Sequence, residues 1–149
     1  MDNLTIRPVT PDYIADIAAL EALIFPDPWS EASLVSALSD ENQSALCIEQ
    51  DGTVAAYLLG CGVAGESEIL RVATHPSFRR RGLGRALLRS FISERMNEGD
   101  STVFLEVRAS NISAIALYAS CGFASFAVRR NYYRNPTEDA VMMRFDLGN

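Results

Sequence analysis

The sequence predicts a mixed α/β fold: a central, mostly antiparallel sheet that contains one parallel pair of strands and is flanked by helices. Strand-like runs at 68–74 and 102–108 flank a helix-like run at 83–96, which makes a β-α-β unit whose crossover joins parallel strands. Asp51-Gly52 lies between two apolar runs, as in a hairpin turn, and a last antiparallel pair turns at Asn135-Pro136. The 149 residues, 48% of them hydrophobic, suit a single domain spanning 1–149 with a packed core.

The chain begins with a strand and a helix. Residues 4–9 alternate like a short strand, and Thr10-Pro11 resembles an N-cap followed by proline at the first helical position. The helix is expected to run to about Ile24, where the segment 25–29, Phe-Pro-Asp-Pro-Trp, breaks it. Its buried stripe is expected to comprise Ile14, Ile17, Ala18 and Leu20 or Glu21.

A second short helix and a hairpin follow. Ser30 is expected to cap a helix that carries Leu34, Val35 and Leu38. Residues 45–49 and 54–59 are then expected to pair as the two strands of the Asp-Gly hairpin.

The later elements have recognisable ends. The helix from Leu83 is expected to end at Gly99, because glycine adopts the left-handed conformation that follows many helices. Asn111 is a good N-cap for a helix at 112–120, which Gly122 closes, and strands at 124–133 and 140–147 complete the chain. The buried stripe of the helix from Leu83 is expected to comprise Leu83, Leu87, Leu88, Phe91, Ile92 and Met96.

Composition excludes several classes of protein. A net charge of −6 disfavours general binding to nucleic acid, which requires clustered cations. The start of the chain has no basic region before an apolar stretch, and no run approaches the ~18 apolar residues of a membrane span, so a cytoplasmic protein without membrane contact is expected. Cys47, Cys61 and Cys121 are odd in number and lack metal or redox spacing, which indicates reduced thiols in or near the core and no metal site.

The strand-to-helix turn at 79–84, Arg-Arg-Arg-Gly-Leu-Gly, predicts an anion site. The first N–H groups of a helix lack intrahelical partners and lie at the positive end of its dipole. Gly82 and Gly84 have no side chains that would keep an anion away from this backbone. The arginines can bind phosphate oxygens in bidentate fashion. The alternative is a solvated basic face. The turn lacks the Lys-Ser/Thr ending of a P-loop and the three-glycine spacing of a dinucleotide fingerprint, which disfavours NTP and NAD.

Further signatures follow this turn in a fixed order. They are Leu-Glu-Val-Arg at 105–108, Asn111, Leu-Tyr at 117–118 and Gly-Phe at 122–123. With them the chain resembles, over nearly its whole length, the GNAT superfamily of acetyl-CoA-dependent N-acetyltransferases. Four segments resemble in particular the ribosomal-protein-alanine N-acetyltransferases of the RimI type: 25–30, 105–111, 114–118 and 129–133.

The resemblance implies a GNAT fold, in which the two parallel strands splay apart and the pantetheine arm of acetyl-CoA, the co-substrate, lies between them. The backbone of Val72, Ala73 and Thr74 is then expected to pair with that arm, and Asn111 to contact CoA. Arg71 departs from the family pattern, where a smaller polar residue such as asparagine is expected; it either lies near the acceptor or covers the sheet. The pyrophosphate is expected to bind at Arg80, Arg81, Gly82, Leu83, Gly84 and Arg85.

Two side chains are candidates for the acetyl-transfer chemistry. Glu106 lies in an otherwise apolar strand, where a carboxylate is costly unless it has a partner or a function. Its alternative is an ion pair with a neighbouring arginine; the resemblance implies a general base acting through water. Tyr118 is either an ordinary core tyrosine or, as the resemblance implies, the donor of a proton to the CoA thiolate. Transfer is expected to be direct, in a ternary complex, and Cys121 is expected to be structural because the lone His75 has no evident partnership with it.

The acceptor is expected to be a protein or peptide N-terminus. At pH 7 an α-amine of pKa ~8 costs about 1.4 kcal/mol to deprotonate, whereas a lysine of pKa ~10.4 costs about 4.6 kcal/mol. A single carboxylate base therefore suits the α-amine better, although active sites shift lysine pKa values. The resemblance implies that Phe25, Trp29, Tyr132 and Tyr133 bracket the acceptor, and the alternative is that they pack loops.

The sequence is consistent with three functions. The leading hypothesis is acetylation of the N-terminal alanine of a small-subunit ribosomal protein. The second is acetylation of a small amine such as a polyamine or aminoglycoside, because one fold hosts many acceptors. The third is a non-catalytic CoA-binding module, in which Glu106 and Tyr118 would only pack.

Overall fold

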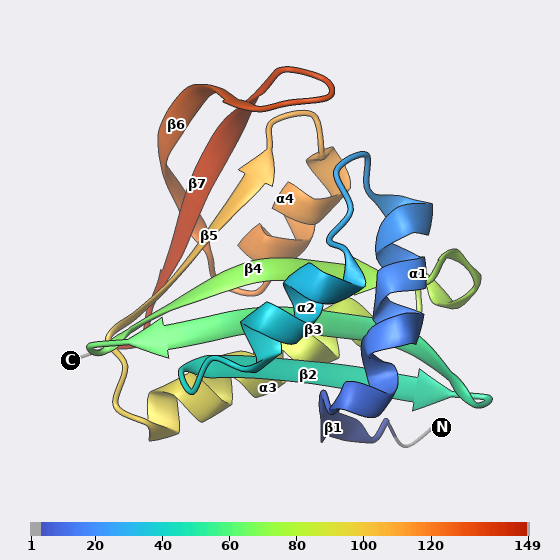
Figure 1. The fold of residues 1–149 in the computed structure, drawn as a ribbon. Coiled ribbons are helices and arrows are strands. Elements are labelled where there is room, and N and C mark those ends of the chain that lie inside the picture. Colours follow the sequence, from blue (N-terminus) through green and yellow to red (C-terminus); the bar gives the residue numbers. More distant parts are fainter. Residues whose placement is uncertain (1–3, 149) are drawn as a thin grey trace.

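The computed structural model describes residues 4–148 and arranges their strands in one seven-stranded sheet, in the order β1-β2-β3-β4-β5-β7-β6. Figure 1 shows α1 and α2 over one face of this sheet and α3 over the opposite face. The mixed α/β architecture expected from the sequence is confirmed. No helix in the described range is long and apolar enough to cross a membrane.

The first four strands are antiparallel neighbours. They are β1 (Ile6–Pro8), β2 (Gln43–Gln50), β3 (Thr53–Val63) and β4 (Glu66–Thr74). Asp51 and Gly52 form the β2–β3 turn with φ of 55° and 75°, both left-handed, as the Asp-Gly pair predicts. The first strand is shorter than the predicted 4–9.

The N-terminal helices follow the sequence with one correction. The first turn is a 3₁₀ segment, η1 (Pro11–Tyr13), ahead of α1 (Ile14–Ile24), and Thr10 makes no side-chain cap. The tighter turn is closed by the Tyr13 N–H, which donates to the Thr10 carbonyl at 3.0 Å. In α2 (Glu31–Leu38), the Ser30 hydroxyl accepts a hydrogen bond from Ser33 N, so the predicted cap is confirmed.

The longest helix, α3 (Leu83–Asn97), packs its apolar stripe on the sheet. Leu83, Leu87, Leu88, Phe91 and Ile92 are buried as predicted. Met96 is 50% exposed, which corrects the expectation that it continues the stripe. Met96 lies in the last turn of α3, which extends past the buried core. The apolar period of the helix therefore continues where the sheet no longer covers it.

The C-terminal elements are β5 (Thr102–Arg108), α4 (Ile112–Ser120), β6 (Ala124–Tyr133) and β7 (Glu138–Asp146). The Asn111 side chain caps α4 by accepting a hydrogen bond from Ala114 N at 3.2 Å. Gly99 and Gly122 follow α3 and α4 with φ of 87° and 108°, which confirms both predicted helix ends.

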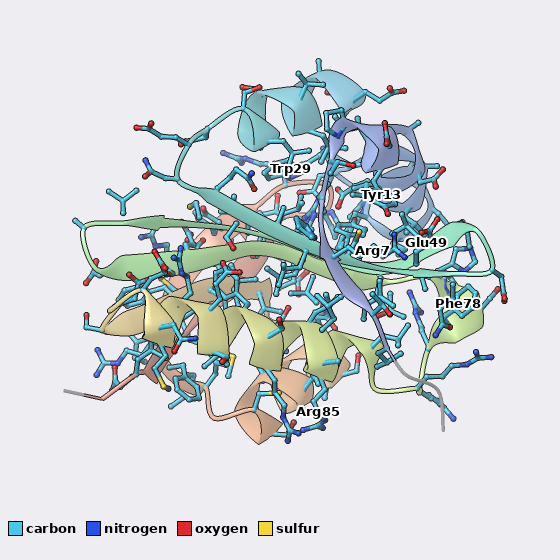
Figure 2. The ribbon with its side chains drawn as sticks, turned by 90° about the horizontal axis from the view of Figure 1, so that it is seen from below. Arg7, Tyr13, Trp29, Glu49, Phe78 and Arg85 are labelled. Atoms are coloured by element: carbon cyan, nitrogen blue, oxygen red, sulfur yellow. The ribbon has the colours of Figure 1, made fainter. Side chains whose placement is uncertain are left out.

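The apolar residues form two clusters, one on each face of the sheet. One cluster joins α3 and α4 to the sheet, and the other joins α1 and α2 to it. Figure 2, viewed along the sheet, shows Trp29 on the α1/α2 side and Arg85 on the α3 side. Any site that uses both groups of helices must therefore cross the plane of the sheet.

The sheet opens between β4 and β5. These strands pair in parallel from Glu66↔Thr102 to Ile69↔Leu105, and the pairing stops there. At the same point β4 carries an extra residue, Leu70, because Gly60 pairs with Ile69 while Leu59 pairs with Arg71. Such a bulge bends a strand and increases its twist. Figure 1 shows the result: β5, β7 and β6 turn away from β4, which confirms the splayed pair.

Candidate active site

A cavity of about 450 Å³ lies where the parallel strands separate. Residues from β4, β5, β6, α4 and the loop between α1 and α2 line it. It therefore joins the two faces of the sheet through the gap. Of the residues predicted for the site, the cavity brings together Phe25, Trp29, Val72, Glu106, Asn111, Tyr118, Tyr132 and Tyr133.

Glu106 reaches the cavity because it faces away from the core. In β5 Val103, Leu105 and Val107 are buried against α3 and α4, so the intervening side chains project to the opposite face. Among residues 4–148, no hydrogen-bond partner reaches the buried Oε2 of Glu106. The nearby Glu106 carboxylate raises the pKa of the Tyr132 phenol. The expected alternative, an ion pair with a neighbouring arginine, is not formed within the described part of the chain.

Tyr118 is both a core residue and a cavity residue. Its ring packs edge-on against Phe123 with the centroids 6.0 Å apart, on the α4 side of the cavity. Burial, with a smaller contribution from Tyr133, raises the pKa of Tyr118 to about 12. The phenol therefore stays protonated at neutral pH and can donate a hydrogen bond to a charge that develops in the cavity.

Arg71 lines the same cavity and is held by a buried carboxylate. Its guanidinium lies 2.9 Å from Glu21 on α1, whose side chain is fully buried, and its carbon lies 3.8 Å from the centre of the Phe25 ring. Tyr57 on β3 donates a hydrogen bond to the same carboxylate, and the Trp29 N–H donates to it at 2.9 Å. Burial and the hydrogen bond to Glu21 raise the pKa of Tyr57. Glu21 thus fixes Arg71 and the start of α2 together.

A second arginine ties two loops to the cavity wall. Arg108 at the end of β5 contacts Glu138 at 3.3 Å and donates to the carbonyls of Arg134 and Pro136 in the β6–β7 loop. The carboxylate of Asp27, in the α1–α2 loop, lies 3.9 Å from Arg108 and 3.8 Å from Arg71. Asp27 therefore links the two loops that face each other across the cavity. Sequence reasoning did not select Glu21, Asp27 or Arg108 as site residues, because their partners are distant in the chain.

An irregularity in β6 places the two tyrosines. Arg129 pairs with Ala140 and Tyr133 pairs with Glu138, so three residues of β6 stand opposite one residue of β7. Within this bulge Asn131 has a φ of 52°, and its N–H donates to Asp139 at 2.8 Å. The rings of Tyr132 and Tyr133 meet edge to face, 5.1 Å apart, and Arg108 lies over Tyr133. Bulges are common beside active sites, where they redirect side chains.

The predicted anion cradle lies in the connection between β4 and α3, and none of its residues lines the cavity. The first intrahelical bond of α3 runs from Ala86 N to Gly82 O, so the preceding N–H groups of the helix lack intrahelical acceptors. Gly82 has a φ of 78°, and a Cβ there would meet open space; glycine is required at this position by the backbone alone. At Gly84 a Cβ would lie 3.3 Å from Leu117, so this glycine permits α3 to pack on α4.

The side chains of the cradle have different roles. Arg80 and Arg81 are exposed, and Arg80 has a φ of 66°. Leu83 is buried in the core, so only its backbone can face an anion. Arg85 Nη1 lies 4.0 Å from the sulfur of Cys121, which is a half-buried free thiol. Ala73 packs on the α1/α2 side, and neither Ala73 nor Thr74 lines the cavity, whose β4 wall ends at Val72.

The sequence and this geometry match known proteins. Residues 14–123 match the acetyltransferase (GNAT) family. The chain is 43% identical to the ribosomal protein bS18-alanine N-acetyltransferase of Escherichia coli K12, over 80% of this chain and 82% of that protein. The chain belongs to the GNAT acetyltransferase family. As a GNAT protein it is an acetyl-CoA-dependent N-acetyltransferase.

Two further comparisons agree with this assignment to the GNAT family. The N-alpha-acetyltransferase RimI of Mycobacterium tuberculosis is 34% identical, over 99% of this chain and 95% of that protein. The crystal structure of the ribosomal-protein-S18-alanine N-acetyltransferase from Escherichia coli superposes with a TM-score of 0.91 at 36% identity, covering 99% of this chain and 96% of that one.

Proposed function

We propose that this GNAT acetyltransferase modifies the N-terminal α-amine of a protein, and that its acceptor is the N-terminal alanine of ribosomal protein bS18. One structural observation carries the chemistry: the unpartnered carboxylate oxygen of Glu106 and the protonated phenol of Tyr118 line the same cavity from opposite sides of the strand gap. The acceptor follows from the relatives, two of which carry bS18-alanine or N-alpha-acetyltransferase in their names. We propose a cytoplasmic location together with this acceptor.

Glu106 is the proposed general base. Its free oxygen accepts a proton from the acceptor ammonium, directly or through one water, and the neutral amine then has the lone pair that attacks the thioester carbonyl. The nitrogen–carbon bond forms, the carbon–sulfur bond breaks and the sulfur departs with the electron pair. The attacking nitrogen loses a second proton to solvent as it becomes the neutral amide. Because the amine attacks the thioester itself, no acyl-enzyme forms and Cys121 has no part.

Tyr118 is the proposed acid. The departing thiolate accepts either a hydrogen bond or the proton itself from the phenol. The raised pKa of Tyr118 ensures that this proton is present at neutral pH. The ring contact with Phe123 fixes the direction of the phenol, so donation costs little reorganisation.

The remaining predicted residues bind acetyl-CoA. Beyond Ile69, β4 pairs with β3 on one side, as in Leu58↔Val72, and loses β5 on the other, so its free edge is proposed to pair with pantetheine. The turn and first helical residues, 80–85, are proposed to bind the pyrophosphate. The Asn111 carbonyl oxygen already caps α4, which leaves its amide N–H groups for CoA.

Aromatic residues form the proposed acceptor entrance. Phe25 and Trp29 come from the α1–α2 loop, and Tyr132 and Tyr133 from the bulged end of β6. Asp27 and the two arginines that it contacts hold these loops across the cavity. We propose that an extended peptide N-terminus enters the cavity between these two loops.

The test is acetyl-CoA-dependent mass gain on short basic peptides that differ only at residue one, with N-terminally blocked, lysine-containing copies as controls. Selective modification of the alanine-starting peptide, with the blocked peptide untouched, is the expected result. Modification of the blocked peptide would contradict the α-amine assignment. Turnover of polyamines or aminoglycosides but of no peptide would identify a small-amine acetyltransferase, and CoA binding without any transfer would identify a binding module.

A further inference from the structure

Glu68 is a carboxylate of the cavity to which the proposed chemistry gives no role. It lies on β4 opposite Phe104 of β5 in the parallel register. Paired residues of neighbouring strands project to the same face, and the side chains of a strand alternate. Glu68, Phe104 and Glu106 therefore project to the same face, and both glutamates line the cavity at the point where the strands part.

The two carboxylates lack compensating charge. Neither Glu68 nor Glu106 takes part in an ion pair within residues 4–148, whereas Arg71 and Arg108 are engaged by Glu21, Asp27 and Glu138. Burial, and next the charge of Glu106, raise the pKa of Glu68. Arg129 of β6 opposes this effect, but it is exposed and lies over the Tyr132 ring. Tyr132 of β6 and Cys61 of β3 are the other titratable groups whose pKa values Glu68 affects.

An uncompensated pair of carboxylates in a half-buried cavity is unfavourable until a cation enters it. A peptide α-amine, with a pKa of about 8, is mostly an ammonium at pH 7. It carries three donors, enough to reach both carboxylates and still leave one N–H for water. The charge that the cavity lacks is thus the charge that the proposed acceptor carries.

We propose that Glu68 binds the acceptor ammonium together with Glu106, and that Glu106 alone then accepts its proton. This inference rests on the proposed function. Glu68 gains and loses no proton in the step: the ammonium gives one proton to Glu106 and becomes the neutral nucleophile. Glu68 binds the ammonium, which is the abundant form of the amine at pH 7. Glu106 then removes a proton from it inside the cavity.

The test compares Glu68→Gln with Glu66→Gln, a matched change at an exposed position two residues earlier on β4. Initial rates on an alanine-starting peptide are measured from pH 6.5 to 9. At pH 7, Glu68→Gln is expected to raise KM for the peptide about tenfold or more, the effect of losing one charged hydrogen bond, and to leave KM for acetyl-CoA unchanged. Glu66→Gln is expected to match the wild type.

The pH dependence separates ammonium binding from a structural role. The loss in kcat/KM is expected to shrink above about pH 8, where the free acceptor is already neutral. Glu68→Asp, which keeps the charge, is expected to recover part of the rate at pH 7. A loss that is the same at every pH, an unchanged KM for the peptide, or no recovery in Glu68→Asp would overturn the role of Glu68.

Failure of the proposed function gives a different result. Wild-type inactivity on all peptides overturns the peptide acceptor and leaves Glu68 testable on whichever amine is turned over. With a polyamine acceptor, whose amines stay protonated across this pH range, Glu68→Gln is expected to keep its loss at every pH. Equal KM values of wild type and variant for that amine would overturn the binding role.

Discussion

The guanidinium of Arg71 and the carboxylate of Glu21 form a buried ion pair, with Nη2 and Oε1 2.9 Å apart. Arg71 also donates from Nε to both carboxylate oxygens. The pair joins α1 to the β4 bulge, where the sheet opens, and Arg71 also donates to the carbonyl of Asp27 at 2.9 Å. The arginine that departs from the family pattern therefore supports the α1–α2 loop.

Arg71→Leu is expected to destabilise the fold by about 3–5 kcal/mol, because it leaves the Glu21 charge buried and uncompensated. The measurement is the free energy of unfolding by denaturant titration. Arg7→Leu is the matched control: Arg7 is 53% exposed and lies 4.0 Å from Glu49, a surface contact worth about 0–1 kcal/mol. Figure 2 shows Arg7 and Glu49 close together near Tyr13. Equal losses in the two variants would contradict a special role for the buried pair.

Glu106→Gln is expected to lower kcat by roughly 10²–10⁴-fold, the usual contribution of a positioned general base, while acetyl-CoA still binds. The amide keeps the shape of the side chain and removes its basicity. The checks are steady-state rates on the alanine-starting peptide and calorimetric binding of acetyl-CoA. Glu98→Gln, at an exposed position after α3, is the control and is expected to retain full activity. An active Glu106→Gln enzyme would remove Glu106 from the mechanism.

Short sequence patterns predict most of the turns and helix ends of this fold. They predict few of the contacts around the cavity. The Asp51-Gly52 turn, the Ser30 and Asn111 caps and the glycines after α3 and α4 depend on neighbouring residues, and all were confirmed. The strand splay came from the family resemblance, because it depends on a bulge at Leu70 that alternation does not reveal.

The support of the α1–α2 loop depends on contacts between distant residues. Glu21 and Arg71 are 50 positions apart in the chain, and neither residue type alone indicates a buried pair. The apolar run predicts only that Glu68 begins a strand, because its position beside Glu106 depends on a neighbouring strand. The sequence contains one indication of these site residues. Charged residues recur in strands that are otherwise apolar, where an unpaired charge is costly.

Tyr118→Phe is expected to reduce kcat by roughly 10²-fold and to change KM little for either substrate. Loss of one hydrogen bond to a charge that develops in the transition state has an effect of this size. The ring and its contact with Phe123 remain, so the free energy of unfolding is expected to change little. Tyr13→Phe removes a hydroxyl that contacts Glu49 at 3.5 Å, far from the cavity, and is the control. Equal kcat values for Tyr118→Phe and wild type would leave Tyr118 a packing residue.

Gly82→Ala separates backbone strain from phosphate binding. An alanine at a φ of 78° costs about 1–2 kcal/mol, and its Cβ meets no atom within 4 Å. Gly65→Ala in the β3–β4 turn, with a φ of 83° and the same open surroundings, is expected to lose similar stability. KM for acetyl-CoA is expected to rise only in Gly82→Ala, because the methyl group stands beside the proposed pyrophosphate site. A similar KM increase in both variants would assign the effect to strain alone.

Glu68→Gln is expected to stabilise the folded protein as pH rises, at the cost of activity. Burial and Glu106 raise the pKa of Glu68 above the ordinary 4.5, so the unfolded chain loses this proton at a lower pH than the folded protein does. As pH rises from about 4.5 through the raised pKa, the wild type therefore loses stability that the uncharged glutamine retains. Denaturant midpoints of variant and wild type are expected to agree near pH 4 and to differ at pH 7, with the variant higher. Glu66→Gln, at an exposed position, is expected to show no such divergence. If the glutamine variant is less stable than the wild type at pH 7, Glu68 has a favourable partner in the free enzyme. The expected result is instead a gain in stability together with a loss of peptide affinity. Such a trade-off between stability and activity is typical of a residue that binds substrate.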